Sequence, residues 1–218
     1  MTAAQDPNEL FDVVTWRGDP TGVRKRRHDV HRDGDWHPAI HIWVIGRRDG
    51  VGFLLVQRRS QGKDTQPGAL DVTVGGHLGA GETWREGLRE ADEEIGLSVS
   101  EQDVVFAGIR RGILETNSGI LDHEIQRVFF VRNDAPLTDY RPNPAELAGL
   151  IEISLDDILE LASGTRDSAT VDVLDASTLT VESGQIKRPE LARSADRYFY
   201  RVAIAARLFL AGEKHFSV

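Results

Sequence analysis

A glycine-rich stretch that runs directly into an acidic helical segment is the feature that most constrains this chain. Glycine fills four of the seven positions from 75 to 81, and glycine allows a backbone to approach a ligand closely. From Thr83 to Ile95, apolar residues recur at helical spacing, and Gly96 follows as a typical helix terminator. We therefore predict a ligand-binding loop that leads into a helix.

Three carboxylates of this helix, Glu90, Glu93 and Glu94, lie within one turn of one another. Like charges at this spacing destabilise a helix unless a cation neutralises them. Carboxylate oxygens are hard ligands that suit Mg²⁺ or Mn²⁺. The spacing therefore indicates a divalent metal site, and the alternative is a solvated acidic face.

Strand-like and helix-like patterns alternate along the rest of the chain, which is typical of an α/β or α+β fold. We expect strands at 37–45, 53–57, 70–74, 104–113 and 124–131, and further helices at 155–162 and 190–211. Glycine and proline near position 19 predict a hairpin within residues 9–31, and residues 165–189 are expected to form a loop with short strands. The predicted organisation has three parts: an N-terminal arm and hairpin (1–36), a catalytic domain (37–163), and an insertion loop with a C-terminal helix packed on that domain (164–218).

The composition excludes several classes of function. The 218 residues contain no cysteine, which removes disulfides and cysteine nucleophiles and fits a cytoplasmic location. The net charge of −9 disfavours a nucleic-acid-binding surface. No apolar run is long enough to span a membrane, and the polar N-terminus lacks the features of a secretory signal. We expect a protein that acts on a small molecule, with no nucleic-acid or membrane partner.

The glycine-rich loop and acidic helix together resemble the Nudix box, the signature of the Nudix hydrolase superfamily. The box has a glycine pair, Gly-Glu, then Arg-Glu-x-x-Glu-Glu-x-Gly and an apolar residue; the chain has Gly75 in its loop and matches the pattern at Gly76, Glu82, Arg89, Glu90, Glu93, Glu94, Gly96 and Leu97. Six residues separate Glu82 from Arg89, one fewer than is usual in the family, which puts the role of Glu82 in doubt. The resemblance implies an α/β/α sandwich with a mixed sheet, to which this chain adds a hairpin and a C-terminal helix.

The resemblance also implies roles for individual residues. In Nudix hydrolases the acidic helix holds divalent metal against a diphosphate, so Glu90, Glu93 and Glu94 are the expected ligands of Mg²⁺ or Mn²⁺. Arg89 is expected to orient one of these carboxylates. Glu124 is the candidate general base and Glu93 is its alternative. The implied reaction is attack of water on a nucleoside diphosphate or another organic diphosphate.

Other segments look like the isopentenyl-diphosphate isomerase branch of this superfamily, including residues 31–37, 57–68 and 122–124. In those isomerases, residues similar to His31, His37, His77, Asp122 and Glu124 bind metal, and residues similar to Arg59 and Lys63 hold the diphosphate. The isomerases also need a cysteine in the loop that here reads Val-Gly-Gly-His at 74–77, and this chain has none. Hydrolysis is therefore favoured over isomerisation, and a non-catalytic nucleotide-binding module is the third alternative.

Several residues have simpler interpretations that the sequence leaves open. His77 can cap the helix or bond the backbone, His31 and His37 can fix the hairpin on the sheet, and Lys63 can be a solvated lysine. The basic run 24–27 is expected to face solvent. Four further histidines are treated as non-catalytic: His28, His41, His123 and His215. The hairpin and the last helix are candidate surfaces for a homodimer.

Overall fold

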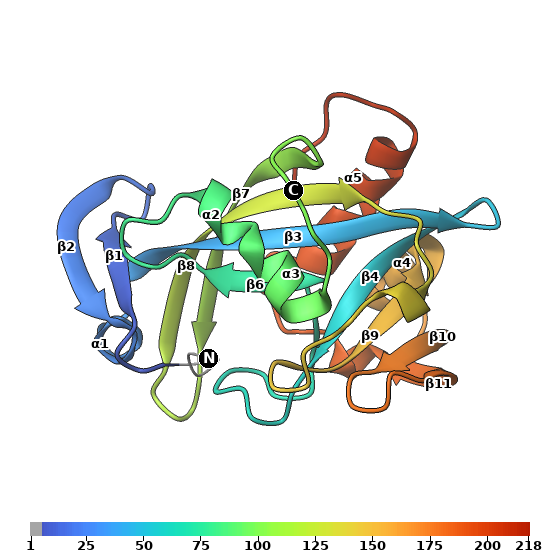
Figure 1. Cartoon of the computed structure of the whole chain (residues 1–218), viewed down its shortest axis with the longest axis horizontal. Coiled ribbons are helices and arrows are strands. Elements are labelled where there is room, and N and C mark those ends of the chain that lie inside the picture. The colour runs from blue at the N-terminus through green and yellow to red at the C-terminus, as the bar shows by residue number, and fades with distance from the viewer. Residues whose placement is uncertain (1–5) are drawn as a thin grey trace.

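A large mixed sheet forms the centre of the computed structural model, which describes residues 6–218 (Figure 1). The strand order is β11-β10-β9-β4-β3-β1-β2, with β5 on β4, β6 and β8 on β3, and β7 on β8. The first five residues of the predicted N-terminal arm lie outside the described residues. Among residues 6–218, β3 and β8 form the one parallel pair, and the expected mixed sheet is confirmed.

The strand β3 (Trp36–Arg48) is central to the fold because each of its two faces packs against a different apolar layer. Successive side chains of a strand point to opposite faces. Ile40 and Ile42 therefore pack against the acidic helix, whereas Trp43 and Ile45 pack against α4 (Leu155–Ser163) and α5 (Tyr198–Leu210). Figure 1 shows α3 in front of the sheet and α5 behind it, which is the expected α/β/α arrangement.

The N-terminal region contains the predicted hairpin and one helix that was not predicted. The hairpin consists of β1 (Leu10–Val14) and β2 (Pro20–Arg26). The helix α1 (Arg27–Asp33) follows, and Gly34 ends it in the left-handed conformation with φ 70°. The expectation that the basic run 24–27 faces solvent is wrong for Arg27, which is 8% exposed because its guanidinium lies against His77 and Asp64.

The predicted helix over 83–95 is present but divided at Leu88. Its two parts are α2 (Trp84–Gly87) and α3 (Arg89–Ile95), and the helix begins at Thr83 with a capping box to Glu86. The amide of Leu88 donates to the carbonyl of Arg85, three residues back, so the chain tightens there. The split falls within the segment that is one residue shorter than usual in Nudix boxes.

The remaining strands lie close to their predicted positions, and one strand was missed. The observed strands are β4 (Val51–Arg59), β5 (Leu70–Asp71), β6 (Val74–His77), β7 (Val104–Glu115), β8 (Leu121–Arg132) and the unpredicted β9 (Leu147–Ser154). A short 3-10 helix, η1 (Leu137–Asp139), precedes β9. Ser154 caps α4, because its hydroxyl accepts the amide of Asp157.

The C-terminal region corrects two expectations. Residues 165–189 contain the expected short strands, but these strands do not lie in a loop: β10 (Ser168–Asp175) and β11 (Val181–Lys187) form a hairpin, and β10 pairs with β9 to extend the main sheet. The last helix begins at Tyr198 and not at position 190. After a 3-10 turn, η2 (Arg188–Glu190), the chain runs beside β5, where the Ala192 amide donates to the Leu70 carbonyl. No helix among residues 6–218 is long and apolar enough to cross a membrane.

Candidate functional site

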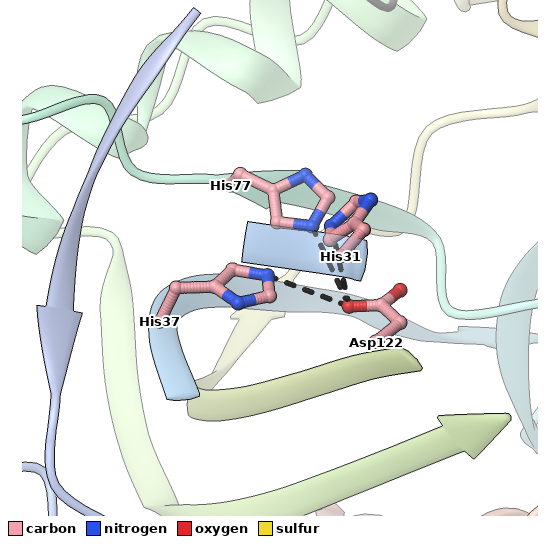
Figure 2. Close-up of side chains that lie close together, drawn as sticks. All are labelled: His31, His37, His77 and Asp122. Carbon is pink, nitrogen blue, oxygen red and sulfur yellow. Dashed lines mark ion pairs between the residues drawn. The ribbon is translucent and has the colours of Figure 1, made fainter. Parts of the chain in front are cut away.

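Three histidines and an aspartate from four separate elements converge at one point (Figure 2). His31 comes from α1, His37 from the start of β3, His77 from the end of β6 and Asp122 from β8. One ligand atom from each lies within 4.8 Å of the others. Asp122 Oδ1 is 3.4 Å from His37 Nε2, 3.7 Å from His31 Nε2 and 3.9 Å from His77 Nε2. We call these four residues the His–Asp cluster.

Most of the atoms that face one another in the His–Asp cluster lack hydrogen-bond partners. His31 Nε2, His37 Nε2 and Asp122 Oδ1 are buried, and no hydrogen bond to them is found among residues 6–218. His77 Nε2 is also buried, but it lies 3.0 Å from Glu124 Oε1. His37 Nδ1 lies 3.0 Å from the Asp35 carbonyl, so Nδ1 carries the proton of the neutral ring and Nε2 presents a lone pair. Lone pairs aimed at a carboxylate are costly unless a cation lies between them, and this donor set fits a divalent metal ion.

The pKa values of the histidines in the cluster also indicate that a cation belongs there. Burial lowers the pKa of the His31 ring to about 4, so His31 is neutral at pH 7. Burial also disfavours a charge on His77, but the carboxylates of Asp122 and Glu124, which accept from the protonated ring, outweigh it and raise the pKa of His77 to about 9. The cluster therefore attracts one positive charge, which in the metal-free protein is the His77 proton.

Phe11 closes the cluster on the side of the N-terminal hairpin. Its ring is fully buried and stacks on His37 and His77, with ring centroids 5.3 and 4.9 Å apart. Phe11 belongs to β1, so the hairpin supplies the apolar wall, and α1 supplies His31. The interpretation that His31 and His37 simply fix the hairpin to the sheet does not account for their unpartnered Nε2 atoms.

The acidic helix gathers its carboxylates around Arg89. The guanidinium lies 3.1 Å from Glu82 Oε1, 3.0 Å from Glu90 Oε1 and 3.6 Å from Glu93 Oε1. Glu82 Oε2 also accepts the Gly79 amide at 2.7 Å, so this loop residue is fixed between the loop and Arg89. Despite the shortened box, Glu82 holds the guanidinium in place.

Glu94 is buried and Glu90 is half-buried, whereas the Glu93 side chain is 58% exposed. Partial burial raises the pKa of Glu90 to about 7, against the opposing charge of Arg89. Burial raises the pKa of Glu94 well above its usual range, and Glu94 Oε2 has no partner among residues 6–218. Two carboxyls that resist ionisation are a further sign that a cation belongs beside them.

The strand β6 separates the acidic helix from the His–Asp cluster. Neighbouring residues of a strand face opposite sides, so Gly76 faces the helix and His77 faces the cluster. A Cβ at position 76 would lie 2.7 Å from Glu90 Cδ, so any side chain there would displace Glu90. Gly76 therefore lets the acidic helix approach the strand that carries His77.

Glu124 is held as a carboxylate by a chain of hydrogen bonds. Its Oε1 lies 3.0 Å from His77 Nε2, and its Oε2 accepts the Gln126 amide. Gln126 Oε1 accepts from Arg110 at 2.6 Å, and Arg110 pairs with Asp196 at 2.8 Å. Burial alone would raise the pKa of Glu124, but the hydrogen bond and charge of His77 lower it to about 2.

One cavity of 980 Å³ brings most of the predicted residues together. Its lining includes Arg59, Lys63, Gly75, Gly76, His77, Arg89, Glu90, Glu93, Glu94, Asp122 and Glu124. His31, His37 and Glu82 do not line the cavity, but each lies next to a residue that does. Arg59 is bonded to Thr65 and Asp71, and Lys63 is paired with Glu146, so a bound phosphate would compete with protein carboxylates for both cations.

The sequence interpretation missed the residues that support Glu124. Gln126 follows Asp122 and Glu124 at the two-residue period of a strand, and this alternation is the signal that places it on the same face. Arg110 and Asp196 carry no such signal because they lie on β7 and on the segment before α5, far apart in the sequence. His41, interpreted as non-catalytic, also lines the cavity.

Comparison with known proteins identifies the family to which the chain belongs. The NUDIX domain matches residues 35–172. An uncharacterized Nudix hydrolase of Clostridium acetobutylicum is 33% identical over 144 residues, which cover 66% of this chain and 69% of the relative. The isopentenyl-diphosphate Delta-isomerase of Brevibacterium linens is 35% identical over 142 residues, which cover 64% of this chain and 74% of the relative.

A solved structure agrees with these relatives. The crystal structure of DR0079 from Deinococcus radiodurans superposes with a TM-score of 0.52 at 25% identity, and the match covers 72% of this chain and 90% of that one. The expected resemblance to both Nudix hydrolases and the isomerase branch is therefore confirmed. With its Nudix box, its sandwich fold and a family match over most of its length, the chain belongs to the Nudix hydrolase family.

Proposed function

We propose that this Nudix hydrolase cleaves the diphosphate linkage of a nucleoside diphosphate or another organic diphosphate, with Mg²⁺ or Mn²⁺ as its cofactor. The observation that carries the proposal is the cavity, which joins the acidic helix to the His–Asp cluster, where three buried polar atoms have no hydrogen-bond partner among residues 6–218. A diphosphate is polyanionic, and a cavity this rich in carboxylates can accept it only together with cations.

Two groups of residues would hold divalent metal: Glu90, Glu93 and Glu94 on the helix, and His31, His37, His77 and Asp122 in the cluster. Metal bound there would neutralise phosphate oxygens and lower the pKa of a coordinated water. Arg89 orients the helix carboxylates through its contacts with Glu82, Glu90 and Glu93. Arg59 and Lys63 contribute the positive charge for the substrate phosphates.

Glu124 is our candidate for the general base. It is ionised at neutral pH, and Gln126 fixes one of its oxygens. Glu124 lines the cavity, and its Oε1 lies 3.0 Å from His77 Nε2. A deprotonated His77, the form that binds metal, would leave this oxygen able to accept a proton from water.

A phosphate-release screen tests the proposal. The panel contains nucleoside diphosphates, nucleotide sugars, coenzyme A, thiamine diphosphate and prenyl diphosphates, each with Mg²⁺, with Mn²⁺ and with excess chelator. We expect metal-dependent hydrolysis of at least one class. Full activity in chelator would exclude the metal role, and no hydrolysis of any class would favour a non-catalytic binding module.

Isomerisation of a prenyl diphosphate is the second candidate, because the His–Asp cluster places the isomerase-like residues together and a relative carries that name. The chain lacks the acid that protonates the double bond: the loop offers Gly75 and Gly76 where the isomerases have a cysteine. We expect no deuterium in the allylic positions after incubation of isopentenyl diphosphate in deuterated water with Mg²⁺. Substantial incorporation, measured by NMR, would favour the isomerase.

A further inference from the structure

His41 is buried in the sheet yet lines the cavity, and no role in the proposed reaction has been assigned to it. It lies on β3, opposite Gly75 of β6. A Cβ at position 75 would lie 3.6 Å from both His41 Nε2 and Cδ2. Because Gly75 has no side chain, the Nε2 edge of the ring is left uncovered on that side.

The other edge of the ring is bonded to Tyr198, the first residue of α5. His41 Nδ1 lies 3.0 Å from the Tyr198 hydroxyl, which also accepts the indole N–H of Trp43 at 2.9 Å. Indole can only donate, so the Tyr198 oxygen is the acceptor in that bond. The guanidinium of Arg110 lies 4.1 Å from the centre of the Tyr198 ring and helps to hold it in place.

These two bonds fix which nitrogen of His41 carries the proton. The Tyr198 hydroxyl hydrogen is buried, and His41 Nδ1 is its available acceptor among residues 6–218. A buried hydroxyl left without an acceptor is costly, so the hydroxyl donates to Nδ1. A neutral imidazole with an accepting Nδ1 must carry its hydrogen on Nε2.

We propose that His41 is a substrate-binding residue, which donates its Nε2–H to a phosphate oxygen of the bound diphosphate, and that Tyr198 is the positioning residue that fixes this tautomer. The inference rests on the proposed diphosphate substrate. Burial lowers the pKa of His41 to about 4, so the ring stays neutral and remains a donor without adding charge. The hydrogen bond of His41 found among residues 6–218 is made through Nδ1, and the Nε2 edge borders the cavity, which leaves this donor for a ligand.

The positioning role of Tyr198 also explains why the start of α5 and the segment before it reach the site. Tyr198 fixes the tautomer of His41. Asp196 helps to orient the carboxylate of Glu124 through Arg110 and Gln126. Both residues lie beyond residue 172, where the NUDIX match ends. The C-terminal segment therefore orients two groups of the cavity from outside the family core.

Nitrogen NMR of the histidine-labelled, metal-free full-length protein tests the tautomer without any substrate. We expect a protonated Nε2 and an unprotonated Nδ1 at His41 near neutral pH, and a mixture of tautomers in Tyr198→Phe. A proton on Nδ1 in the wild type overturns the proposal. Adding methylenebisphosphonate with Mg²⁺ should shift the His41 Nε2–H signal and leave exposed His215 unchanged, and an unchanged His41 signal also overturns it.

Kinetics on the best-cleaved diphosphate supply the second test. His41→Leu should lower kcat/KM about 10-fold to 100-fold, which is the effect of one lost hydrogen bond to a charged group. His41→Gln keeps an N–H donor and should recover most of the loss, whereas His215→Gln serves as the matched control. An unchanged kcat/KM in His41→Leu would contradict the proposed role of His41. Equal losses of kcat/KM in His41→Leu and His41→Gln, at unchanged melting temperature, would contradict it as well. Should no diphosphate be cleaved, the proposed function fails and the two NMR measurements still decide the role of His41.

Discussion

The two candidate metal-binding regions on either side of β6 differ in how their charges are balanced. The acidic helix contains its own cation, because Arg89 contacts Glu82, Glu90 and Glu93. In the His–Asp cluster, His31 Nε2, His37 Nε2 and Asp122 Oδ1 are buried and face one another with no hydrogen-bond partner among residues 6–218. The helix can keep its arrangement without metal, whereas the cluster is incomplete without a proton or a metal ion. A carboxylate cluster is therefore weaker evidence for a metal than a set of converging lone pairs.

The largest effect is expected when the carboxylates of the helix are neutralised. We predict that Glu93→Gln and Glu94→Gln each lower turnover by at least about 100-fold, since both are expected to hold metal against the substrate. Folding should be preserved, because Gln has the shape of Glu and Glu94 already resists ionisation. Steady-state kinetics with Mg²⁺ measure the change, and exposed Glu213→Gln is the control. Near-normal turnover at limiting Mg²⁺ would contradict the assignment.

Direct metal binding separates the two regions. Calorimetric titration with Mn²⁺ should show that Asp122→Asn weakens binding to the His–Asp cluster at least about 10-fold, because the variant keeps the shape but loses the charge that three imidazoles face. Binding to the acidic helix should persist in Asp122→Asn and be lost in Glu93→Gln. If both variants lost the same single ion, the two regions would form one site and the comparison would fail.

Acid sensitivity tests His41, a buried histidine that lies outside both candidate metal-binding regions. The pKa of His41 is lowered to about 4 by burial, from an ordinary value of 6.5. Between these values the unfolded chain binds a proton that the folded chain refuses, so stability falls as the pH falls below 6.5. From pH 8 to 5.5 this histidine should cost the metal-free protein about 1 kcal/mol of unfolding free energy.

Urea denaturation at several pH values measures this cost. His41→Gln should lose less stability than the wild type over the same range, by about that amount, and His215→Gln should follow the wild type. Equal losses in the wild type and His41→Gln would show that His41 is not the group that titrates.

The smallest effect is expected for the residue farthest from the chemistry. Asp196→Asn removes the charge that holds Arg110, which in turn holds Gln126 against Glu124. We predict about a 3-fold lower kcat with an unchanged KM, because Glu124 is less firmly oriented but substrate contacts remain. Asp167→Asn, at a 90% exposed side chain, is the control. A change confined to KM would place Asp196 in substrate binding instead.

The sequence predicted local features better than it predicted their assembly. The acidic helix lies in one continuous segment, so its spacing alone was enough to place Glu90, Glu93 and Glu94 on one turn. Most strands were found because each carries a local run of β-branched and aromatic residues. The sequence pattern does not predict β9, and it predicts a loop with short strands for residues 165–189. Both segments extend the sheet beyond β4.

The His–Asp cluster could not be derived from spacing. Its members lie on four elements between residues 31 and 122, and what joins them is the pairing of β3 with both β6 and β8. Only the resemblance to the isomerases suggested that these residues belong together. The burial of Arg27 escaped detection for the same reason, since its partners are distant in the sequence. Pairing between distant strands is a property of the whole chain, and a local window cannot contain it.

The way Phe11 lies against the histidine rings bears on how such a domain can be shortened or recombined. A fragment that began at the predicted boundary of residue 37 would keep the acidic helix and most of the sheet. It would lack His31 and the aromatic wall, and His37 and His77 would be open to water. The hairpin is thus a component of the site, and grafting the Nudix core alone onto another protein would transfer the signature motif but leave one of its two ligand sets unfinished.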